Sequence, residues 1–442
     1  MVFLPDMPAF SVDAIRADGT DLECTVSATG GLSRFLSGDP FRVSYDRPID
    51  DVPRSVLIIP VLSQLCPVAW ARGGDVRAPV VDQRFARSLA AVRDALGDMH
   101  SFIAGGQLRA PRRRTEVPDR TDGSGLLFTG GVDSTASYVR HRDEAPTLVS
   151  IRGWTITPDA ADDHKWDVLR ARVNSFAKPR DLETAFVESN MLRFLDHPML
   201  LAHYKRHVDG AWYSSVGHGL GLTGLCAPLA YASGIGDLYV AATHWEGIDL
   251  AWGSRPDIDG HVRWAGVECH HDGYELTRQE RLDLLATYAE ESPHELELQT
   301  CNDRLDGNCG RCEKCYRTAI GLRLAGLDPI DHGYRFTDTD YRTVRESFER
   351  GHWVLGIDER HMWADIRDRA RETTPRSQAE RAFFAWLDSV DLDELVDSSR
   401  PPLSHRVLRA GARAMPTGVY RRLYPLWSEA TTIRRRLAQG RN

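Results

Sequence analysis

The chain is 442 residues long, with 42% hydrophobic and 27% charged residues and a net charge of −8. This composition is typical of a globular protein of two or three domains, excludes a largely disordered chain, and disfavours wholesale binding to nucleic acid. No apolar run approaches the ~20 residues of a membrane-spanning helix and the start carries no basic export signal, so we expect a cytoplasmic protein without a membrane span.

Residues 1–122 are predicted to form a β-rich domain of unknown role. Three segments there are rich in apolar residues or alternate apolar with polar residues, and turns with Gly and Asp lie between them. This pattern is typical of strands, and the segments are 10–17, 22–28 and 41–46. The apolar stretch 55–65 is expected to be buried, but its pattern does not separate helix from strand. The spacing over 85–103 predicts an amphipathic helix, and the polar, Pro/Gly-rich segment 105–125 is interpreted as a linker.

Residues 123–330 are predicted to be an α/β domain, a parallel sheet with helices on both faces. Short apolar segments alternate with helical ones, which is typical of parallel strands joined by crossover helices. The predicted strands are 125–128, 147–154, 184–189 and 237–243. A buried helix is predicted over 221–235. In such sheets the ligand binds beyond the carboxyl ends of the strands.

Residues 331–442 are predicted to be a helical region with an Arg-rich tail. The tail, 403–442, carries nine arginines and a single acid, Glu429. A solvated helical face explains such a run, and docking onto RNA, an acidic partner or an anionic membrane surface is the alternative. The N-terminal domain and this tail are therefore the candidate surfaces for a protein partner or RNA. The oligomeric state is left open, with a homodimer as one option.

The most informative segment runs from Leu126 to Thr135 and reads LLFTGGVDST. Its pattern predicts a buried strand, a Gly-Gly turn and a helix start. Adjacent glycines allow the main chain to approach an anion closely, and a helix start offers free N–H groups to phosphate. Thr129, Ser134 and Thr135 add hydroxyl donors. An ordinary capped helix has similar residues, but the preceding strand favours a phosphate site. The Walker A pattern is absent.

This segment resembles the S-G-G-x-D-S signature of the PP-loop ATP pyrophosphatases, with Thr129 in place of the first Ser. That family includes GMP synthetase, argininosuccinate synthetase, tRNA-thiolating enzymes and 7-cyano-7-deazaguanine synthase. The resemblance implies ATP and Mg²⁺ as cofactors, Ser134 as a catalytic residue, and Asp133 as a catalytic residue that orients the loop or contacts Mg²⁺. The residues that it assigns to the ATP site are Phe128, Thr129, Gly130, Gly131, Val132, Asp133, Ser134 and Thr135.

Four of the eight cysteines are clustered: Cys301, Cys309, Cys312 and Cys315. Clustered thiols in a large chain without an export signal favour a metal over disulfides. Four thiolates close a tetrahedral shell around Zn²⁺ and leave no position for a catalytic water, so the ion is expected to be structural. An iron–sulfur cluster is the alternative. The spacing, and its place after the glycine turn, resemble the zinc motif of the 7-cyano-7-deazaguanine synthases (QueC-like proteins).

Further site residues are predicted between the two motifs. Residues 243–260 follow a predicted strand and are rich in polar and aromatic side chains, as a substrate loop would be. Residues 253–257 loosely resemble a stretch of the QueC-like proteins. Arg278, at a predicted helix start, could reach a carboxylate or phosphate and is assigned to catalysis. His218 is assigned to the nucleotide site, with a structural histidine as the alternative.

The leading hypothesis is an adenylate-forming ATP pyrophosphatase that activates a carboxylate or amide oxygen of a small-molecule or peptide substrate. The resemblance implies a 7-deazaguanine-type substrate. The alternatives are an adenylating enzyme of peptide or amino-acid chemistry, such as a muramyl-peptide epimerase, and a QueC-like component of antiphage defence. A tRNA-thiolating enzyme would need Cys226 or Cys269 as its catalytic thiol. A non-catalytic, ATP-sensing subunit is the alternative outside enzymes.

Overall fold

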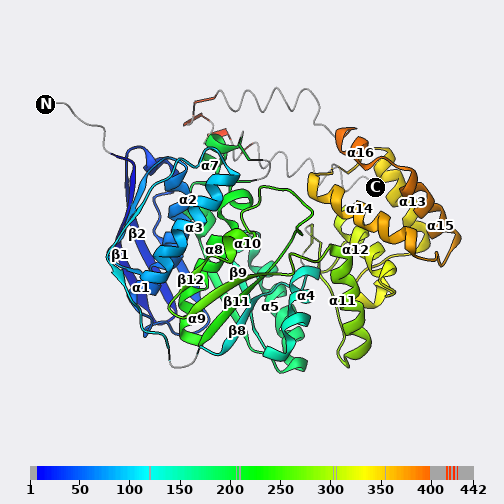
Figure 1. The fold of residues 1–442 in the computed structure, drawn as a ribbon, viewed down its shortest axis with the longest axis horizontal. Helices are drawn as coiled ribbons and strands as arrows, with labels where there is room; N and C mark the ends of the chain where they lie inside the picture. Colours follow the sequence, from blue (N-terminus) through cyan, green and yellow to red (C-terminus); the bar gives the residue numbers. More distant parts are fainter. Residues whose placement is uncertain are drawn as a thin grey trace.

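The structure is a computed structural model that describes residues 7–118, 121–205, 207–208, 211–301, 303–304, 306–353, 355–398 and seven positions between 415 and 426. Within these residues, eleven strands form one sheet (Figure 1). In sheet order the strands are β12 (Arg263–Trp264), β13 (Val267–Asp272), β11 (Ile235–Ala241), β8 (Gly123–Leu127), β9 (Thr147–Arg152), β10 (Thr184–Ser189), β3 (Phe41–Tyr45), β2 (Asp21–Thr29), β1 (Ala9–Asp18), β4 (Asp75–Arg77) and β6 (Leu108–Arg109). The short strands β5 (Val81–Asp82) and β7 (Arg112–Arg113) pair separately.

The middle of the sheet is parallel. β8 pairs in parallel with β9 and β11, and β10 and β13 continue the arrangement on either side. These five strands therefore end at one edge of the sheet, the edge that is predicted to carry the ligand. The α/β class is confirmed.

The N-terminal strands extend the same sheet. β3 pairs antiparallel with β10, and β2 and β1 follow in antiparallel order. β3 buries Phe41, Val43 and Tyr45 on one face, and its pairing covers an edge that β10 would otherwise expose. The sheet predicted for residues 123–330 is parallel in its five main strands, but β12 pairs antiparallel with β13, and the complete sheet is mixed. The sheet continues across the predicted boundary between residues 122 and 123.

Helices cover both faces of the parallel strands. Successive strand residues point to opposite faces, so Val149 of β9 joins one core cluster and Leu148 joins the other. Helices on the first face are α1 (Arg54–Leu57), α2 (Ile59–Trp70), α3 (Gln83–Met99), α8 (His218–Leu225), α9 (Ala227–Ser233) and α10 (Pro256–Asp259). Helices on the second face are α4 (Val132–His141), α5 (Asp163–Ala177) and α11 (Arg278–Glu291).

The stretch 55–65, whose type the sequence left undecided, is helical and contributes to α1 and α2. Every residue of α2 is buried. A helix that is apolar all round has no periodicity to reveal it. The buried helix predicted over 221–235 is divided between α8 and α9, with Cys226 between them.

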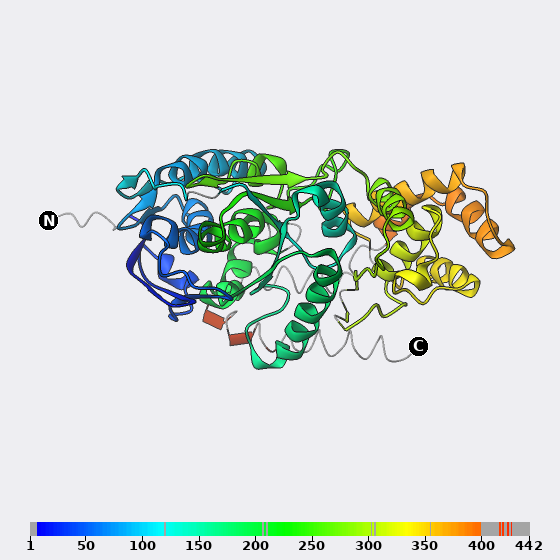
Figure 2. The same ribbon diagram turned by 90° about the horizontal axis from the view of Figure 1, so that it is seen from below.

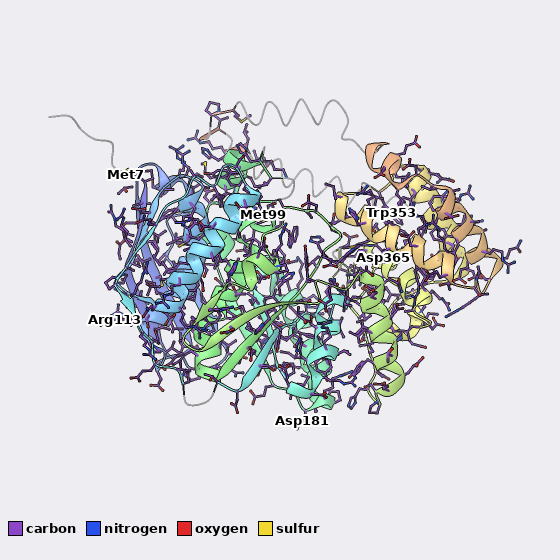
Figure 3. All side chains as sticks on the ribbon, in the orientation of Figure 1. Met7, Met99, Arg113, Asp181, Trp353 and Asp365 are labelled. Atoms are coloured by element: carbon purple, nitrogen blue, oxygen red, sulfur yellow. The ribbon has the colours of Figure 1, made fainter. Side chains whose placement is uncertain are left out.

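The C-terminal part of the described chain is a helical unit beside α11 (Figures 1 and 2). Its helices are α12 (Glu313–Leu324), α13 (Asp338–Glu349), α14 (Ile357–Glu372), α15 (Gln378–Ser389) and α16 (Leu392–Ser398). Phe348 packs edge-on against Trp353 and Trp363 in its core. Asp365 of α14 (Figure 3) accepts the N–H of Gln279 at 2.8 Å, so the unit is fixed to the start of α11.

The short helices α6 (Met191–Phe194) and α7 (His197–Tyr204) follow β10. The predicted Arg-rich tail, 403–442, lies almost wholly outside the described residues. None of the helices that the structure describes is both long enough and apolar enough to cross a membrane.

Candidate functional site

A two-glycine turn joins β8 to α4 at the carboxyl edge of the parallel strands. Gly130 has a φ of 77°, a left-handed conformation that is strained for any residue with a Cβ. Gly131 caps α4, and the N–H of Thr135 donates to its carbonyl at 3.0 Å to close the first turn. The first N–H groups of a helix have no carbonyl of the same helix to bind, so those of α4 are suited to an anion.

The side chains of the turn differ in what they can offer a nucleotide. Phe128 and Val132 are buried in the core, so only their main chain could contribute. Ser134 Oγ accepts the N–H of Thr129 at 3.5 Å and donates to a carbonyl of the turn at 3.4 Å. Thr135 is fully buried, and its hydroxyl has no hydrogen-bond partner among the described residues. The predicted roles of these residues in pyrophosphate binding stay predictions.

We expect Gly130→Ala to lower the free energy of unfolding by about 1–2 kcal/mol, because an L residue in the left-handed region is strained. The added Cβ would also lie 3.2 Å from Cδ of Arg172. Gly131→Ala is the matched control, since Gly131 has a φ of −83° and its added Cβ would meet nothing closer than 3.6 Å. Urea unfolding compares the two variants, and equal stabilities would contradict the argument.

Two arginines of α11 hold Asp133 at the start of α4. Arg278 Nη1 donates to its two carboxylate oxygens at 2.9 and 3.1 Å, and Arg281 Nη1 donates at 2.8 Å. Both guanidinium groups are buried, with 5% of Arg278 and 2% of Arg281 exposed. Burial alone would raise the pKa of Asp133, but the charges of Arg278 and Arg281 outweigh it and lower the pKa below its ordinary value. The carboxylate is therefore charged and oriented at neutral pH.

The segment around the cysteine cluster packs directly on the glycine turn. The main-chain N–H of Gln299 donates to the carbonyl of Gly130 at 2.8 Å. Its side-chain amide donates to the carbonyl of Gly307, within the cluster, at 3.1 Å. Lys314 is half-buried near Asp133 and Arg278, and burial followed by the charge of Arg278 lowers its pKa. The cysteine cluster and the turn are thus parts of one arrangement.

The four predicted metal ligands come together in space. The sulfurs of Cys301, Cys309, Cys312 and Cys315 all lie within 4.8 Å of one another. Two Sγ–Sγ distances are 3.9 Å (Cys301 to Cys312) and 3.8 Å (Cys309 to Cys315). A tetrahedral Zn²⁺ with Zn–S bonds of ~2.3 Å holds its sulfurs about 3.8 Å apart. The cluster could therefore hold a metal ion, and its spacing is compatible with Zn²⁺.

His218 lies in an aromatic cluster at the same edge of the sheet. Its ring centroid is 4.6 Å from that of Trp154, 5.6 Å from Tyr213 and 5.8 Å from Trp252. Trp154 follows β9 and Trp252 follows β11, which explains why the cluster forms at the carboxyl ends of the strands. None of these three rings belongs to the glycine turn, so the predicted contact of His218 with the nucleotide stays a prediction.

We expect His218 to make the stability depend on pH. Burial lowers its pKa to about 4, whereas an unfolded histidine titrates near ~6.5. Between these values the unfolded state binds more protons, so stability is complete above pH ~6.5 and falls by about 3 kcal/mol as the pH decreases towards 4. His218→Gln should flatten this slope in urea unfolding. Burial also lowers the pKa of His197 to about 4, so part of the pH dependence should remain in His218→Gln. An unchanged slope would contradict the assignment.

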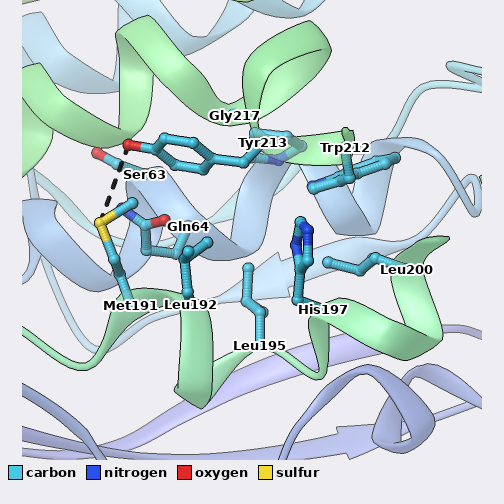
Figure 4. Close-up of a pocket in the computed structure, with 11 residues that line it drawn as sticks. Ser63, Gln64, Met191, Leu192, Leu195, His197, Leu200, Trp212, Tyr213 and Gly217 are labelled. Carbon is cyan, nitrogen blue, oxygen red and sulfur yellow. Dashed lines mark hydrogen bonds between the residues drawn. The ribbon is translucent and has the colours of Figure 1, made fainter. Parts of the chain in front are cut away.

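A small cavity adjoins the His218 cluster on the side of α2 (Figure 4). Gln64, Met191, His197 and Tyr213 are among its lining residues. The hydroxyl of Tyr213 lies 3.9 Å from Sδ of Met191, and its ring also contacts His218. The cavity has a volume of about 10 Å³, which is room for about one water. It is too small to be a nucleotide pocket in this structure.

The predicted substrate loop, 243–260, divides into two parts. Its later residues serve the fold, because Asp259 is fully buried and accepts hydrogen bonds from Ser254 at 2.6 Å and from His271 at 2.8 Å. The earlier part brings His244 towards the glycine turn: the His244 carbonyl accepts a hydrogen bond from Arg281 Nη2 at 2.9 Å.

Several residues of this arrangement were not predicted from the sequence. Arg281 lies three residues after Arg278 in a predicted helix, and that spacing places both on one face, so it could have been found. Gln299 contributes its main chain, and His244 is placed by tertiary contacts. No motif marks either residue.

Comparisons with models of known protein families, with curated proteins and with solved structures found no match for this chain. A functional assignment therefore depends on the sequence motifs and on the geometry of the site.

Proposed function

We propose that this chain is an ATP pyrophosphatase of the PP-loop fold, which adenylates a carboxylate or amide oxygen and releases pyrophosphate and then AMP. The observation that supports this most strongly is the glycine turn at the carboxyl edge, with Asp133 fixed by Arg278 and Arg281. A turn of this kind directs main-chain N–H groups at phosphate. Transfer at the α-phosphorus needs positioning and charge neutralisation rather than covalent chemistry.

In this proposal the main chain of 129–135 binds the β and γ phosphates of ATP. Arg278 and Lys314 add positive charge beside them. Of the two roles considered for Asp133, orientation of the loop is favoured over Mg²⁺ binding, because both carboxylate oxygens already accept hydrogen bonds from arginine. Zn²⁺ in the cysteine cluster would be structural and would hold Gln299 against the turn.

A planar, 7-deazaguanine-type acid is the substrate class that we propose. The aromatic rings of Trp154, Tyr213 and Trp252 around His218 support a flat substrate, since they lie at the same edge as the turn. Acidic peptides are the second class of substrate to be tested.

The decisive test is the identity of the products. The chain is incubated with ATP and Mg²⁺, alone and with a deazaguanine acid or an acidic peptide, and the nucleotides are separated by chromatography. AMP and pyrophosphate are expected, and ADP with phosphate would contradict the proposal. Exchange of labelled pyrophosphate into ATP, dependent on one substrate class, identifies that class because the exchange needs adenylation alone.

A further inference from the structure

A histidine and a carboxylate from two different parts of the chain meet beside the glycine turn. His244 follows β11 at the carboxyl edge, and Asp358 lies in the first turn of α14. His244 Nε2 is 3.7 Å from Asp358 Oδ2, which is within ion-pair distance but too long for a hydrogen bond. The residue is 6% exposed, and Nε2 has no hydrogen-bond partner among the described residues. A buried polar atom without a partner is uncommon, and each one calls for an explanation.

His244 is connected to Asp133 by a single guanidinium group. Arg281 donates through Nη2 to the His244 carbonyl at 2.9 Å and through Nη1 to Asp133 Oδ1 at 2.8 Å. Asp358 is held close because Met362 of α14 packs against Trp245, the residue after His244. The main chain of His244 and the carboxylate of Asp133 are therefore positioned by the same guanidinium group.

The titratable groups that face His244 are few. Asp358 faces it from α14, and His218 faces it from α8 across Trp252. Arg281 of α11 contacts only its main chain. None of the ion pairs formed by the described residues includes His218, whereas His244 has a carboxylate partner, the arrangement that supports an imidazole as a base.

We propose that His244, supported by Asp358, is the proton acceptor for a nucleophile that carries a proton at this site, a water or an amide, whereas a carboxylate needs none. The inference depends on the proposed function. When water attacks, its oxygen forms a bond to the α-phosphorus of ATP, and the bond from that phosphorus to the bridging oxygen breaks. Pyrophosphate leaves with the electron pair, and the proton of the water passes to the imidazole and then to solvent.

The test compares His244→Gln with wild type in the slow conversion of ATP and Mg²⁺ to AMP and pyrophosphate without added substrate. A lost general base should reduce AMP formation about 100-fold, and binding of a fluorescent ATP analogue should change less than twofold. A protonated imidazole cannot accept a proton, so the wild-type rate should fall in acid, and this fall should be absent in His244→Gln. Asp358→Asn should reduce the rate less than His244→Gln does, because the imidazole remains but loses its neighbouring carboxylate.

His270→Gln is the matched control, since His270 also pairs with an aspartate, Asp237, at 2.6 Å on neighbouring strands but is not in the site. His270→Gln should keep the wild-type rate. His244→Gln with the rate of the control, or Asp358→Asn with the wild-type rate, would overturn the inference. A wild-type chain that binds ATP but forms no AMP would instead contradict the proposed function.

Discussion

Asp133→Asn is expected to lower the free energy of unfolding by about 3 kcal/mol and to reduce ATP turnover about 100-fold. The amide keeps the shape of the side chain but removes the charge that balances Arg278 and Arg281, both almost fully buried. Removal of one partner from a buried ion pair leaves the other charge uncompensated, which typically costs several kcal/mol. The start of α4 is also released from α11, and small displacements of a positioned phosphate are enough to lose about two orders of magnitude in rate.

Urea unfolding and AMP release measure the two effects of Asp133→Asn. Asp143→Asn is the control, because Asp143 is exposed just after α4. The lowered pKa of Asp133 gives a third readout: its contribution to stability is present above pH ~4 and is lost as the pH falls through the folded pKa. Asp133→Asn should lack this loss. A variant with the stability and turnover of Asp143→Asn would refute the role of the ion pairs.

The sequence indicated the parallel core of the fold because its signals are local. Strand and helix alternate between residues 123 and 291, and four of the five parallel strands are visible in the apolar pattern. The fifth, β13, was not predicted, because its sequence VECHHD is largely polar. The joining of β3 to β10 could not be predicted, since residues 41–45 and 184–189 are far apart in the sequence and either could have been an edge strand. The N-terminal region was therefore described as a domain of its own, although its strands share a sheet with the parallel core.

In the candidate site, too, the short-range motifs were predictable and the long-range contacts were not. The glycine turn and the four cysteines are short-range motifs, and the structure places the cysteine sulfurs together as predicted. The contacts of Asp133 with α11 and of His244 with α14 join segments more than 100 residues apart. Such contacts depend on how the helices pack, which no spacing in the sequence encodes. His218 differs from these residues. Its residue type suggested a contact with the nucleotide, whereas the structure surrounds it with aromatic rings.

Cys309→Ser is expected to abolish metal binding and, as a consequence, to weaken the binding of ATP. Three thiolates hold Zn²⁺ far less tightly than four, and a structural metal supplies folding free energy to the segment that it closes. That segment contains Asn308, whose amide donates to the Leu298 carbonyl at 2.7 Å, and Gln299, whose N–H fixes Gly130, lies two residues before its first cysteine. Loss of the metal should therefore release the glycine turn from its support and weaken ATP binding more than tenfold, although no ligand of the metal belongs to the turn.

Metal content and ATP affinity are measured on the same preparations. Cys66→Ala is the control, because Cys66 is buried in α2 away from the cluster, and its loss should lower stability slightly while leaving metal and nucleotide bound. A strong chelator applied to the wild-type chain should reproduce the effect of Cys309→Ser without any substitution. If the metal-free chain binds ATP as tightly as the metal-bound chain, the hydrogen bond from Gln299 to Gly130 does not couple metal binding to ATP binding.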